Sequence, residues 1–346
     1  MIRRPPRSTL SPSSAASDVY KRQGSSPAIG DIDGDGDLEI VIGSHDGYIY
    51  CLNGTGALEW RYPTGGWVYS SPAIGDVDDD GALEIIIGSR SNYVYCLNGT
   101  GALEWTYKTG GDIWASPAIG DVDSDGTLEI IIGSDDSYIY CLNGTGGLEW
   151  KYKTGLYVES SAAIGDVDND WALEIIIGSH DYYIYCLSGN GSLEWRYKTN
   201  DEIHSSPALG DIDGNKKLEI IIASHDYNIY CLDGDGTLLW TYQTGYEIWG
   251  SPTIADVDED DNLEVIIGSY DDNIYCLSTQ NTGYRIYWEG LQGHFSINKY
   301  FATKNQHFID SDMDMLSIYS ENLVGTDPYD NDTDDDGMPD GWEVIY

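Results

Sequence analysis

Acidic side chains recur at fixed spacing in six short segments of this sequence. In the first segment, carboxylates stand at positions 1, 3, 5 and 9 of a nine-residue stretch, as Asp31, Asp33, Asp35 and Glu39. Alternating carboxylates on a tightly turning loop converge on one point, and Ca²⁺, which takes about six to eight oxygen ligands, offsets their repulsion. Gly36 at position 6 permits the sharp turn. The pattern predicts calcium loops, whereas Mg²⁺ fits less well because it keeps several waters.

The other five segments repeat these positions. Their expected ligands are Asp76, Asp78, Asp80, Glu84, Asp121, Asp123, Asp125, Glu129, Asp166, Asp168, Asp170, Glu174, Asp211, Asp213, Asn215, Glu219, Asp256, Asp258, Asp260 and Glu264. Trp171 and Asp261 replace the position-6 glycine in the fourth and sixth segments, so we expect strained turns there. The fifth has one acid fewer and Lys216 and Lys217 nearby, so we expect the weakest site. Solvated turns are the alternative, although turn chemistry does not require an acid at position 9.

The acidic segments belong to a repeat with a period of 45 residues. The six cysteines, from Cys51 to Cys276, follow this period, and so does a tryptophan column. Each unit holds four runs rich in Ile, Val, Tyr or Trp, separated by turns rich in Gly, Asn and Asp, which predicts four β-strands. Six units without a helical period predict an all-β fold, a β-propeller of six visible four-stranded blades, with a β-solenoid as the lesser alternative. We expect buried free thiols, because equivalent positions on neighbouring blades lie too far apart for a disulfide.

The charge of the chain excludes some classes of partner. Its 346 residues include 59 acidic and 17 basic residues, which gives a formal net charge of −42. This charge excludes a nucleic-acid-binding surface and disfavours an anionic membrane as a partner. No apolar run is long enough for a transmembrane segment in this fragment.

Two halves of each unit resemble known repeats. GSHDGYIYCLNGTGALEW at 43–60 resembles the PQQ-like, quinoprotein-type repeat, and AIGDIDGDGDLEIVIG at 28–43 is similar to the FG-GAP repeat of integrin-like propellers. The resemblance implies rings of seven or eight blades, so the visible six are expected to be a truncated set. It also implies that one tryptophan column packs between blades: Trp60, Trp105, Trp150, Trp195 and Trp240. The sixth unit departs from the pattern, with Arg285 at the tryptophan position.

The two ends of the chain lie outside the repeats, which cover 24–290. Residues 1–23 share nothing with the repeat, lack the apolar core of a signal peptide and resemble translated sequencing-adapter sequence, so we treat them as a non-native leader. A linker is expected over 291–309. Over 310–346, we expect a calcium-binding segment that resembles thrombospondin type 3-like repeats, with an acidic disordered linker as the alternative.

An EF-hand-like loop lies within this last segment, and a degenerate copy of it spans residues 310–321. Its expected ligands are Asp332, Asp334, Asp336, the Met338 carbonyl, Asp340 and Glu343. Whether an anchor follows residue 346 is left open.

The segment leading into each first strand varies most among the near-identical units. One column holds Tyr69, Trp114, Glu159, His204 and Trp249, and a second holds Trp67, Asp112, Tyr157, Glu202 and Glu247. The aliphatic column between them, from Val68 to Ile248, is expected to face the blade core. The varied side chains should then ring one mouth of the channel, opposite the calcium loops, where aromatic rings beside carboxylates suit a sugar or a peptide. Packing between blades is the alternative, and His45, His180 and His225, in another column, are expected to be exposed turn residues.

These features predict an extracellular, cell-surface propeller that binds several Ca²⁺ ions and serves as a non-catalytic binding or adhesion module for a carbohydrate or protein ligand. The alternative is a propeller enzyme, either a PQQ-dependent dehydrogenase or a polysaccharide lyase or hydrolase. The sequence shows neither an adjacent cysteine pair nor a Ser/His/Asp constellation, so PQQ and catalytic residues are not expected. A carboxylate pair drawn from Glu159, Glu202 and Glu247 stays open as a catalytic alternative.

Overall fold

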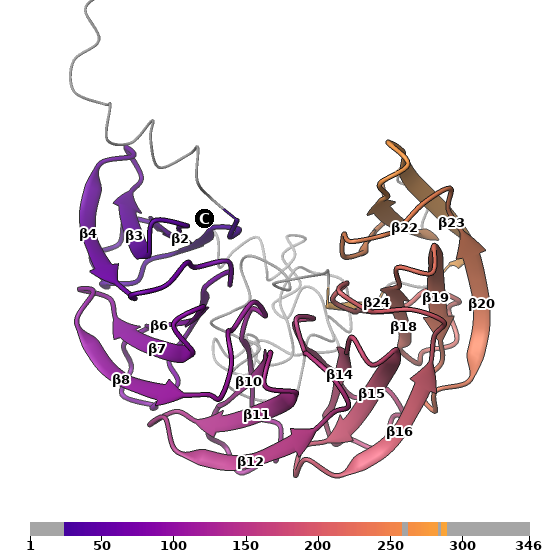
Figure 1. Cartoon of the computed structure of the whole chain (residues 1–346), viewed down its shortest axis with the longest axis horizontal. Helices are drawn as coiled ribbons and strands as arrows, with labels where there is room; N and C mark the ends of the chain where they lie inside the picture. The colour runs from indigo at the N-terminus through magenta and orange to yellow at the C-terminus, as the bar shows by residue number, and fades with distance from the viewer. Residues whose placement is uncertain (1–23, 258–261, 283–284, 289–346) are drawn as a thin grey trace, which may run out of the picture. The chain divides into compact units, whose positions relative to one another are not determined.

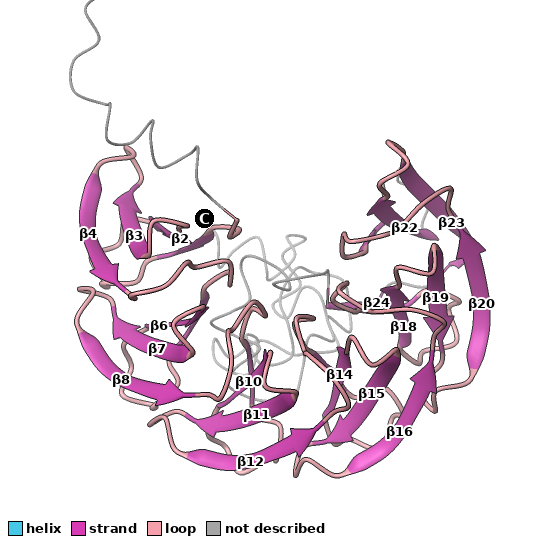
Figure 2. Cartoon of the chain, in the orientation of Figure 1, coloured by secondary structure: helices cyan, strands magenta, loops and turns pink. Residues whose placement is uncertain are grey.

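The computed structural model describes residues 24–257, 262–282 and 285–288. The described residues all belong to one compact unit. Every regular element among the described residues is a β-strand (Figure 2), and none forms a helix that could cross a bilayer. The expectation of an all-β repeat fold is confirmed, whereas the leader, linker and EF-hand-like loop predicted at the ends lie outside the described residues.

The strands form six antiparallel sheets in chain order. Blade 1 contains β1 (Ala28–Gly30), β2 (Glu39–Gly43), β3 (Tyr48–Asn53) and β4 (Leu58–Pro63). Blade 2 contains β5 (Ala73–Gly75), β6 (Glu84–Ser89), β7 (Tyr93–Asn98) and β8 (Leu103–Lys108). Blade 3 contains β9 (Ala118–Gly120), β10 (Glu129–Ser134), β11 (Tyr138–Asn143) and β12 (Leu148–Lys153).

The remaining strands complete three more sheets. Blade 4 contains β13 (Ala163–Gly165), β14 (Glu174–Gly178), β15 (Tyr183–Ser188) and β16 (Leu193–Lys198). Blade 5 contains β17 (Ala208–Asp211), β18 (Glu219–Ala223), β19 (Asn228–Leu232) and β20 (Leu238–Gln243). Blade 6 contains β21 (Thr253–Ala255), β22 (Asn262–Gly268) and β23 (Ile274–Thr282), and a last strand, β24 (Arg285–Trp288), follows.

Each blade is a meander whose strands differ in burial. In blade 2, every residue of β6 (EIIIGS) is buried, because this strand lies between two neighbours of its own sheet and between the adjacent blades. The fourth strand β8 is exposed or half-buried along its length and lies at the outer rim (Figure 1). The hairpin between β3 and β4 turns at Asn53, whose side-chain oxygen accepts hydrogen bonds from the backbone N–H groups of Thr55 and Ala57. The Asn-Gly-Thr-Gly segments therefore form the turns predicted for them.

Neighbouring blades pack through a shared apolar core. Between blades 3 and 4, Ile131, Val158 and Ile175 are fully buried in one cluster, and Trp150 packs against it. The Trp150 indole Nε1–H also donates a hydrogen bond of 2.8 Å to the Gly189 carbonyl of the next blade. Three other tryptophans do the same across their interfaces, Trp60, Trp105 and Trp195. The inter-blade role implied for this column is thus seen in four copies.

The six blades follow one another around an open arc, with the first strands of successive blades side by side, from β1 beside β5 to β17 beside β21 (Figure 1). Blades 1 to 4 are the predicted four-stranded sheets, but blade 6 has three strands. β24, which holds Arg285, pairs instead with β17 and makes blade 5 five-stranded. The prediction of four strands is therefore wrong for the last two blades. The physical reason is that the sixth unit lacks the run that begins the outer strand of the others, which is Leu-Glu-Trp in blades 1 to 4 and Leu-Leu-Trp in blade 5.

The cysteines form no disulfide and five of the six are buried, as predicted, whereas Cys276 is exposed. Burial raises the pKa of the buried thiols, with nearby carboxylates as a further cause for Cys96 and Cys141. Thiols with raised pKa carry little thiolate at neutral pH, so they act as small apolar core residues.

Candidate functional site

The acidic loops join the first and second strands of each blade. In blade 1 the loop leaves β1 after Gly30 and ends at Glu39, the first residue of β2. Position 6 has a left-handed backbone, with φ of 95° at Gly36 and 89° at Gly81. Trp171 and Lys216 adopt φ of 74° and 70° at the same position, which costs a residue with a Cβ about 1–2 kcal/mol. The strain predicted for blade 4 is therefore found, and blade 5 shows it as well, while Asp261, the position predicted to be strained in blade 6, lies outside the described residues.

Two carboxylates close each loop from opposite ends. At position 1, Asp31 Oδ2 accepts a hydrogen bond from the Gly36 N–H, and at position 9, Glu39 Oε2 accepts one from the Ile32 N–H. The contact from position 9 recurs in all six blades: Glu84, Glu129, Glu174, Glu219 and Glu264. In blade 1 one oxygen of Asp31 thus fixes the loop and the other is left over, whereas both oxygens of Asp76 and of Asp166 accept backbone hydrogen bonds.

Several of these second oxygens are buried without a hydrogen-bond partner: Asp31 Oδ1, Glu84 Oε1, Asp211 Oδ1 and Glu264 Oε1. An unpaired buried carboxylate oxygen costs free energy unless a cation or a donor satisfies it. In blade 2, donor oxygens of Asp76, Asp78 and Glu84 lie within 4.8 Å of one another, and blades 1 and 3 have the equivalent trio. These residues fit a Ca²⁺ ion, which accepts carboxylate oxygens in a flexible arrangement.

The position-5 carboxylates also shape their own loops, and their role as ligands stays a prediction. Asp35, Asp80 and Asp125 are exposed, and each accepts a hydrogen bond from the backbone N–H two residues further on. In blade 5 the side-chain amide of Asn215 points to Glu219 Oε1 at 3.5 Å, so an amide donor takes a place that a cation would need. Asp258 and Asp260 lie outside the described residues, as do the ligands expected at Asp332–Glu343.

Crowding of carboxylates changes the protonation of the loops. The pKa values of Glu84, Glu129 and Glu174 are raised to about 8. Burial is the main cause, and repulsion from neighbouring carboxylates, such as Asp78 and Glu104 near Glu84, contributes to the same rise. Glu219 in blade 5 rises less, to about 7. A cation supplies the positive charge that would let these acids ionise together.

Varied side chains lie at the opposite end of each first strand. The aliphatic column between them is fully buried, as Val68, Ile113 and Ile203 show, so the predicted alternation is confirmed. Its neighbours are half-buried or exposed, and Trp67, Tyr157 and Trp249 keep 50%, 49% and 46% of their surface accessible. We call these two varied columns, together with the turn column that contains His45, Arg90, Asp135, His180, His225 and Tyr270, the inner-edge band.

A row of serines fixes the spacing of this band. The backbone N–H of Ser71 donates to Ser116 Oγ in the next blade at 2.9 Å, and the Ser116 N–H donates to Ser161 Oγ at 2.8 Å. Three further bonds continue the row at both ends, from Ser26 to Ser71, from Ser161 to Ser206 and from Ser206 to Ser251. Adjacent blades are thereby joined directly beside the varied side chains.

Aromatic rings dominate the band in blades 1 to 3. The Tyr69 and Trp114 rings lie 4.2 Å apart between centroids, and His45 packs 4.1 Å from Tyr69. The Arg90 guanidinium lies over the rings of Trp67 and Trp114 and forms an ion pair of 2.7 Å with Asp112. This half of the band offers aromatic faces and one paired cation.

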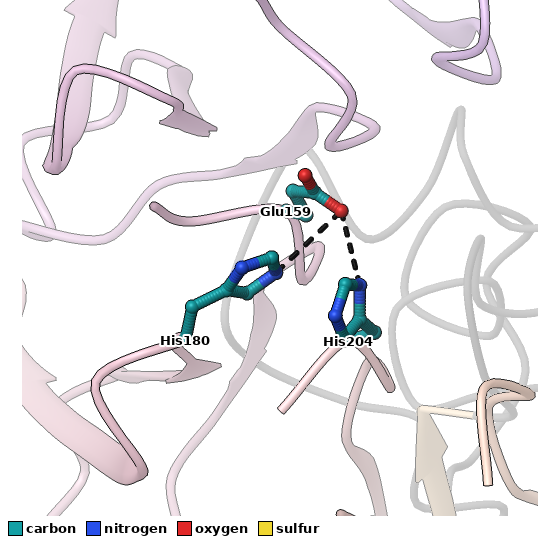
Figure 3. A group of neighbouring side chains, drawn as sticks. All are labelled: Glu159, His180 and His204. Carbon is teal, nitrogen blue, oxygen red and sulfur yellow. Dashed lines mark hydrogen bonds and ion pairs between the residues drawn. The ribbon is translucent and has the colours of Figure 1, made fainter. Parts of the chain in front are cut away.

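Histidines and acids dominate the band in blades 4 to 6. Glu159 lies between two imidazoles, with its Oε2 3.0 Å from His204 Nδ1 and 3.5 Å from His180 Nε2 (Figure 3). Burial opposes ionisation of Glu159, but the two histidines outweigh it and lower its pKa to about 2. On the other side of His204, the His225 ring stacks at 4.2 Å and Glu202 Oε2 lies 3.4 Å from Nε2. The Trp249 ring packs against both His204 and His225 in tilted arrangements, and its indole N–H donates to Glu247.

The expectation that His180 and His225 are exposed turn residues is wrong. Both are buried, at 6% and 8% exposure, because the turn after each second strand folds over the segment that leads into the next first strand. Tyr270, in the same column, is exposed, and Asp135 accepts a hydrogen bond from the Trp114 indole. Burial, followed by the charge of Glu159, raises the Asp135 pKa to about 6. Variation among the units at this column was the signal that could have placed these residues in the band.

Comparison with known families matches two parts of the chain. FG-GAP-like repeats are found at residues 31–87 and 76–132, which contain the first three acidic loops. Residues 208–311 match the lambda-carrageenase beta-propeller domain. The chain is a β-propeller that contains FG-GAP-like repeats. The predicted resemblance to FG-GAP repeats is thus confirmed, and no curated protein sequence matches the chain.

Solved structures similar to this propeller share its fold at low identity. The Vibrio cholerae biofilm matrix protein Bap1 matches 68% of the chain, with 21% identity and a TM-score of 0.56. The chain covers only 42% of Bap1. BamB from Moraxella catarrhalis is similar with 19% identity and a TM-score of 0.54. The match covers 75% of this chain and 73% of the BamB chain. BBS1N, solved in complex with ARL6DN, matches at 12% identity with a TM-score of 0.52, covering 78% of this chain and 85% of that one.

Proposed function

We propose that this propeller is an extracellular, calcium-stabilised module that binds a carbohydrate on its inner-edge band and has no catalytic role. The observation that carries the proposal is the contrast between the two ends of the first strands. Acidic loops with buried, unpartnered carboxylate oxygens recur at one end, which suits structural Ca²⁺. Exposed aromatic rings stand beside carboxylates at the other, which suits a sugar.

The similarities support this proposal at the level of the fold. One matched domain is named for a carrageenase and one similar structure is a biofilm matrix protein, so related propellers occur in a carbohydrate-active protein and in an extracellular matrix. The net charge of −42 favours an uncharged polysaccharide over a sulfated one. A protein ligand on the same band is the nearest alternative occupant.

Binding to two polysaccharides tests the proposal. Affinity electrophoresis of the purified chain in millimolar CaCl₂, through gels containing agarose or λ-carrageenan, should show retardation by agarose in preference to λ-carrageenan. The double variant Trp67→Ala/Trp249→Ala removes two exposed rings, so we expect it to bind at least about tenfold more weakly. Trp171→Ala is the matched control, since Trp171 is 80% exposed but lies on an acidic loop. Equal retardation of the double variant and the wild type would contradict a binding role for the band.

The carrageenase match favours a polysaccharide hydrolase as the second candidate. Glu159 or Glu202 would then act as acid or base, because carboxylates beside histidines are suited to proton transfer. Release of reducing ends from λ-carrageenan that Glu159→Gln abolishes would favour this candidate. No turnover together with agarose binding would support the non-catalytic module.

A further inference from the structure

One carboxylate oxygen and two imidazole nitrogens, all common metal ligands, come together in the inner-edge band. Glu159 precedes β13, His180 follows β14 and His204 precedes β17, so two adjacent blades contribute. Their donor atoms all lie within 4.8 Å of one another, and the Glu159 carboxylate points at both rings (Figure 3). This cluster lies at the opposite end of the first strand from the calcium loops, and it contains nitrogen donors that those loops lack.

The two spacings between Glu159 and the histidines are close to the edges of a tetrahedral zinc site. Zn–N and Zn–O bonds of about 2.0–2.2 Å in a tetrahedron place neighbouring donor atoms about 3.3–3.5 Å apart. Glu159 Oε2 lies 3.0 Å from His204 Nδ1 and 3.5 Å from His180 Nε2. Displacements of a few tenths of an ångström would therefore bring these pairs to the distances of a bound ion.

A buried nitrogen without a hydrogen bond supports the site independently. His180 is 6% exposed, and its Nε2, which faces the Glu159 carboxylate, makes no hydrogen bond. The distance of 3.5 Å to Glu159 Oε2 is within range for an ion pair but not for a well-formed hydrogen bond. Leaving such a nitrogen unsatisfied is costly, and a metal ion at this point would satisfy it.

Glu202 holds the His204 ring in the orientation that a metal requires. His204 Nε2 lies 3.4 Å from Glu202 Oε2, so a ring that carries its proton on Nε2 donates it to Glu202 and directs Nδ1 toward Glu159 and His180. A carboxylate that accepts the second N–H of a ligating histidine is the usual support of a metal-bound imidazole. His225 stacks on His204 at an interplanar angle of 8° and restrains the ring further.

We propose that Glu159, His180 and His204 bind one divalent transition-metal ion, and Zn²⁺ is the probe. Imidazole nitrogens favour Zn²⁺, Ni²⁺ or Cu²⁺ over the hard Ca²⁺ ion that the acidic loops suit. Three protein donors leave a fourth position open for water or for an oxygen of a ligand bound on the band. The proposal does not depend on the calcium loops or on carbohydrate binding.

Calorimetric titration of the full chain with ZnCl₂ tests the site, in buffer with saturating CaCl₂ so that the acidic loops are filled. The wild type should bind one Zn²⁺ ion at the band. Glu202→Gln should weaken this binding by about 10–100-fold, and His180→Ala or His204→Ala by more than that. His45→Ala is the matched control, because His45 occupies the same turn position as His180 but packs against Trp67 and Tyr69.

A spectroscopic readout separates loss of the ligand from loss of the fold. Co²⁺ added in place of Zn²⁺ should give the visible absorption of a tetrahedral complex, and Glu159→Gln, which keeps the size of the side chain, should change that spectrum while the melting temperature in CaCl₂ stays the same. Unchanged Zn²⁺ affinity in His180→Ala and His204→Ala, or no Zn²⁺ binding by the calcium-loaded wild type, would overturn the proposal.

Discussion

The two ends of each first strand differ in how much they vary among the blades. After the strand, the acidic loop keeps an acid at position 9 in all six units, and its N–H contact from position 2 recurs throughout. Before the strand, the corresponding positions change from Tyr69 to Glu159 to His204. The repeated end meets a need common to every blade, which is closure of the acidic loop by its position-9 carboxylate, whereas the varied end changes its side chains beside an aliphatic column and a serine row that stay the same.

The largest expected effect comes from removing calcium. Binding to the native state alone adds about 1.4 kcal/mol per site at ten times Kd, so several sites together stabilise the chain by several kcal/mol. Thermal melting in EDTA should therefore lie well below melting in millimolar CaCl₂, and the shift should be the same for the Trp67→Ala/Trp249→Ala variant. Identical melting curves with and without the ion would show that the loops are only turns.

The next largest expected effect is a dependence of the stability of the calcium-free chain on pH. Glu84, Glu129 and Glu174 have folded pKa values of about 8, above the value of about 4.3 expected in the unfolded chain. The folded state therefore binds protons more tightly, and in EDTA its stability should fall as pH rises from about 5 to about 8. Urea unfolding across this range, with and without CaCl₂, measures the effect. A flat profile in EDTA would contradict the raised pKa values.

The smallest expected effect is relief of backbone strain. Trp171→Gly should raise stability by about 1 kcal/mol, because Trp171 has a φ of 74° and its side chain is mostly exposed. Gly81→Ala, at the same position of blade 2 with φ of 89°, is the matched control and should lower stability by a similar amount. Urea unfolding of both variants in CaCl₂ measures the pair, and destabilisation by Trp171→Gly would show that the indole contributes contacts of its own.

The sequence alone predicts the repeated parts of this molecule well. A fixed period made the cysteine and tryptophan columns visible, and with them the strands, the hairpins at Asn53 and its equivalents, and the packing between blades. The prediction was wrong in the sixth unit, where the sequence departs from the 45-residue repeat. Nothing local indicated that β24 would pair with β17, because pairing between distant segments depends on which sheet edge is available.

The same limit applied to the inner-edge band. The alternation around Val68 and Ile203 correctly predicted which side chains face the core. The burial of His180 and His225 could not be predicted this way, since it arises when the turn of one blade packs against the approach to the next.

The row of serines between blades has a consequence for how binding properties change. Each bond joins the main chain of one blade to a hydroxyl of the next, 45 residues away, and involves none of the side chains in the varied columns. The distance between equivalent positions in successive blades is thus set by these hydrogen bonds and not by the side chains of the varied columns. Single substitutions can therefore change which positions of the inner-edge band hold aromatic rings, carboxylates or imidazoles, while the spacing at which they would contact a ligand stays the same.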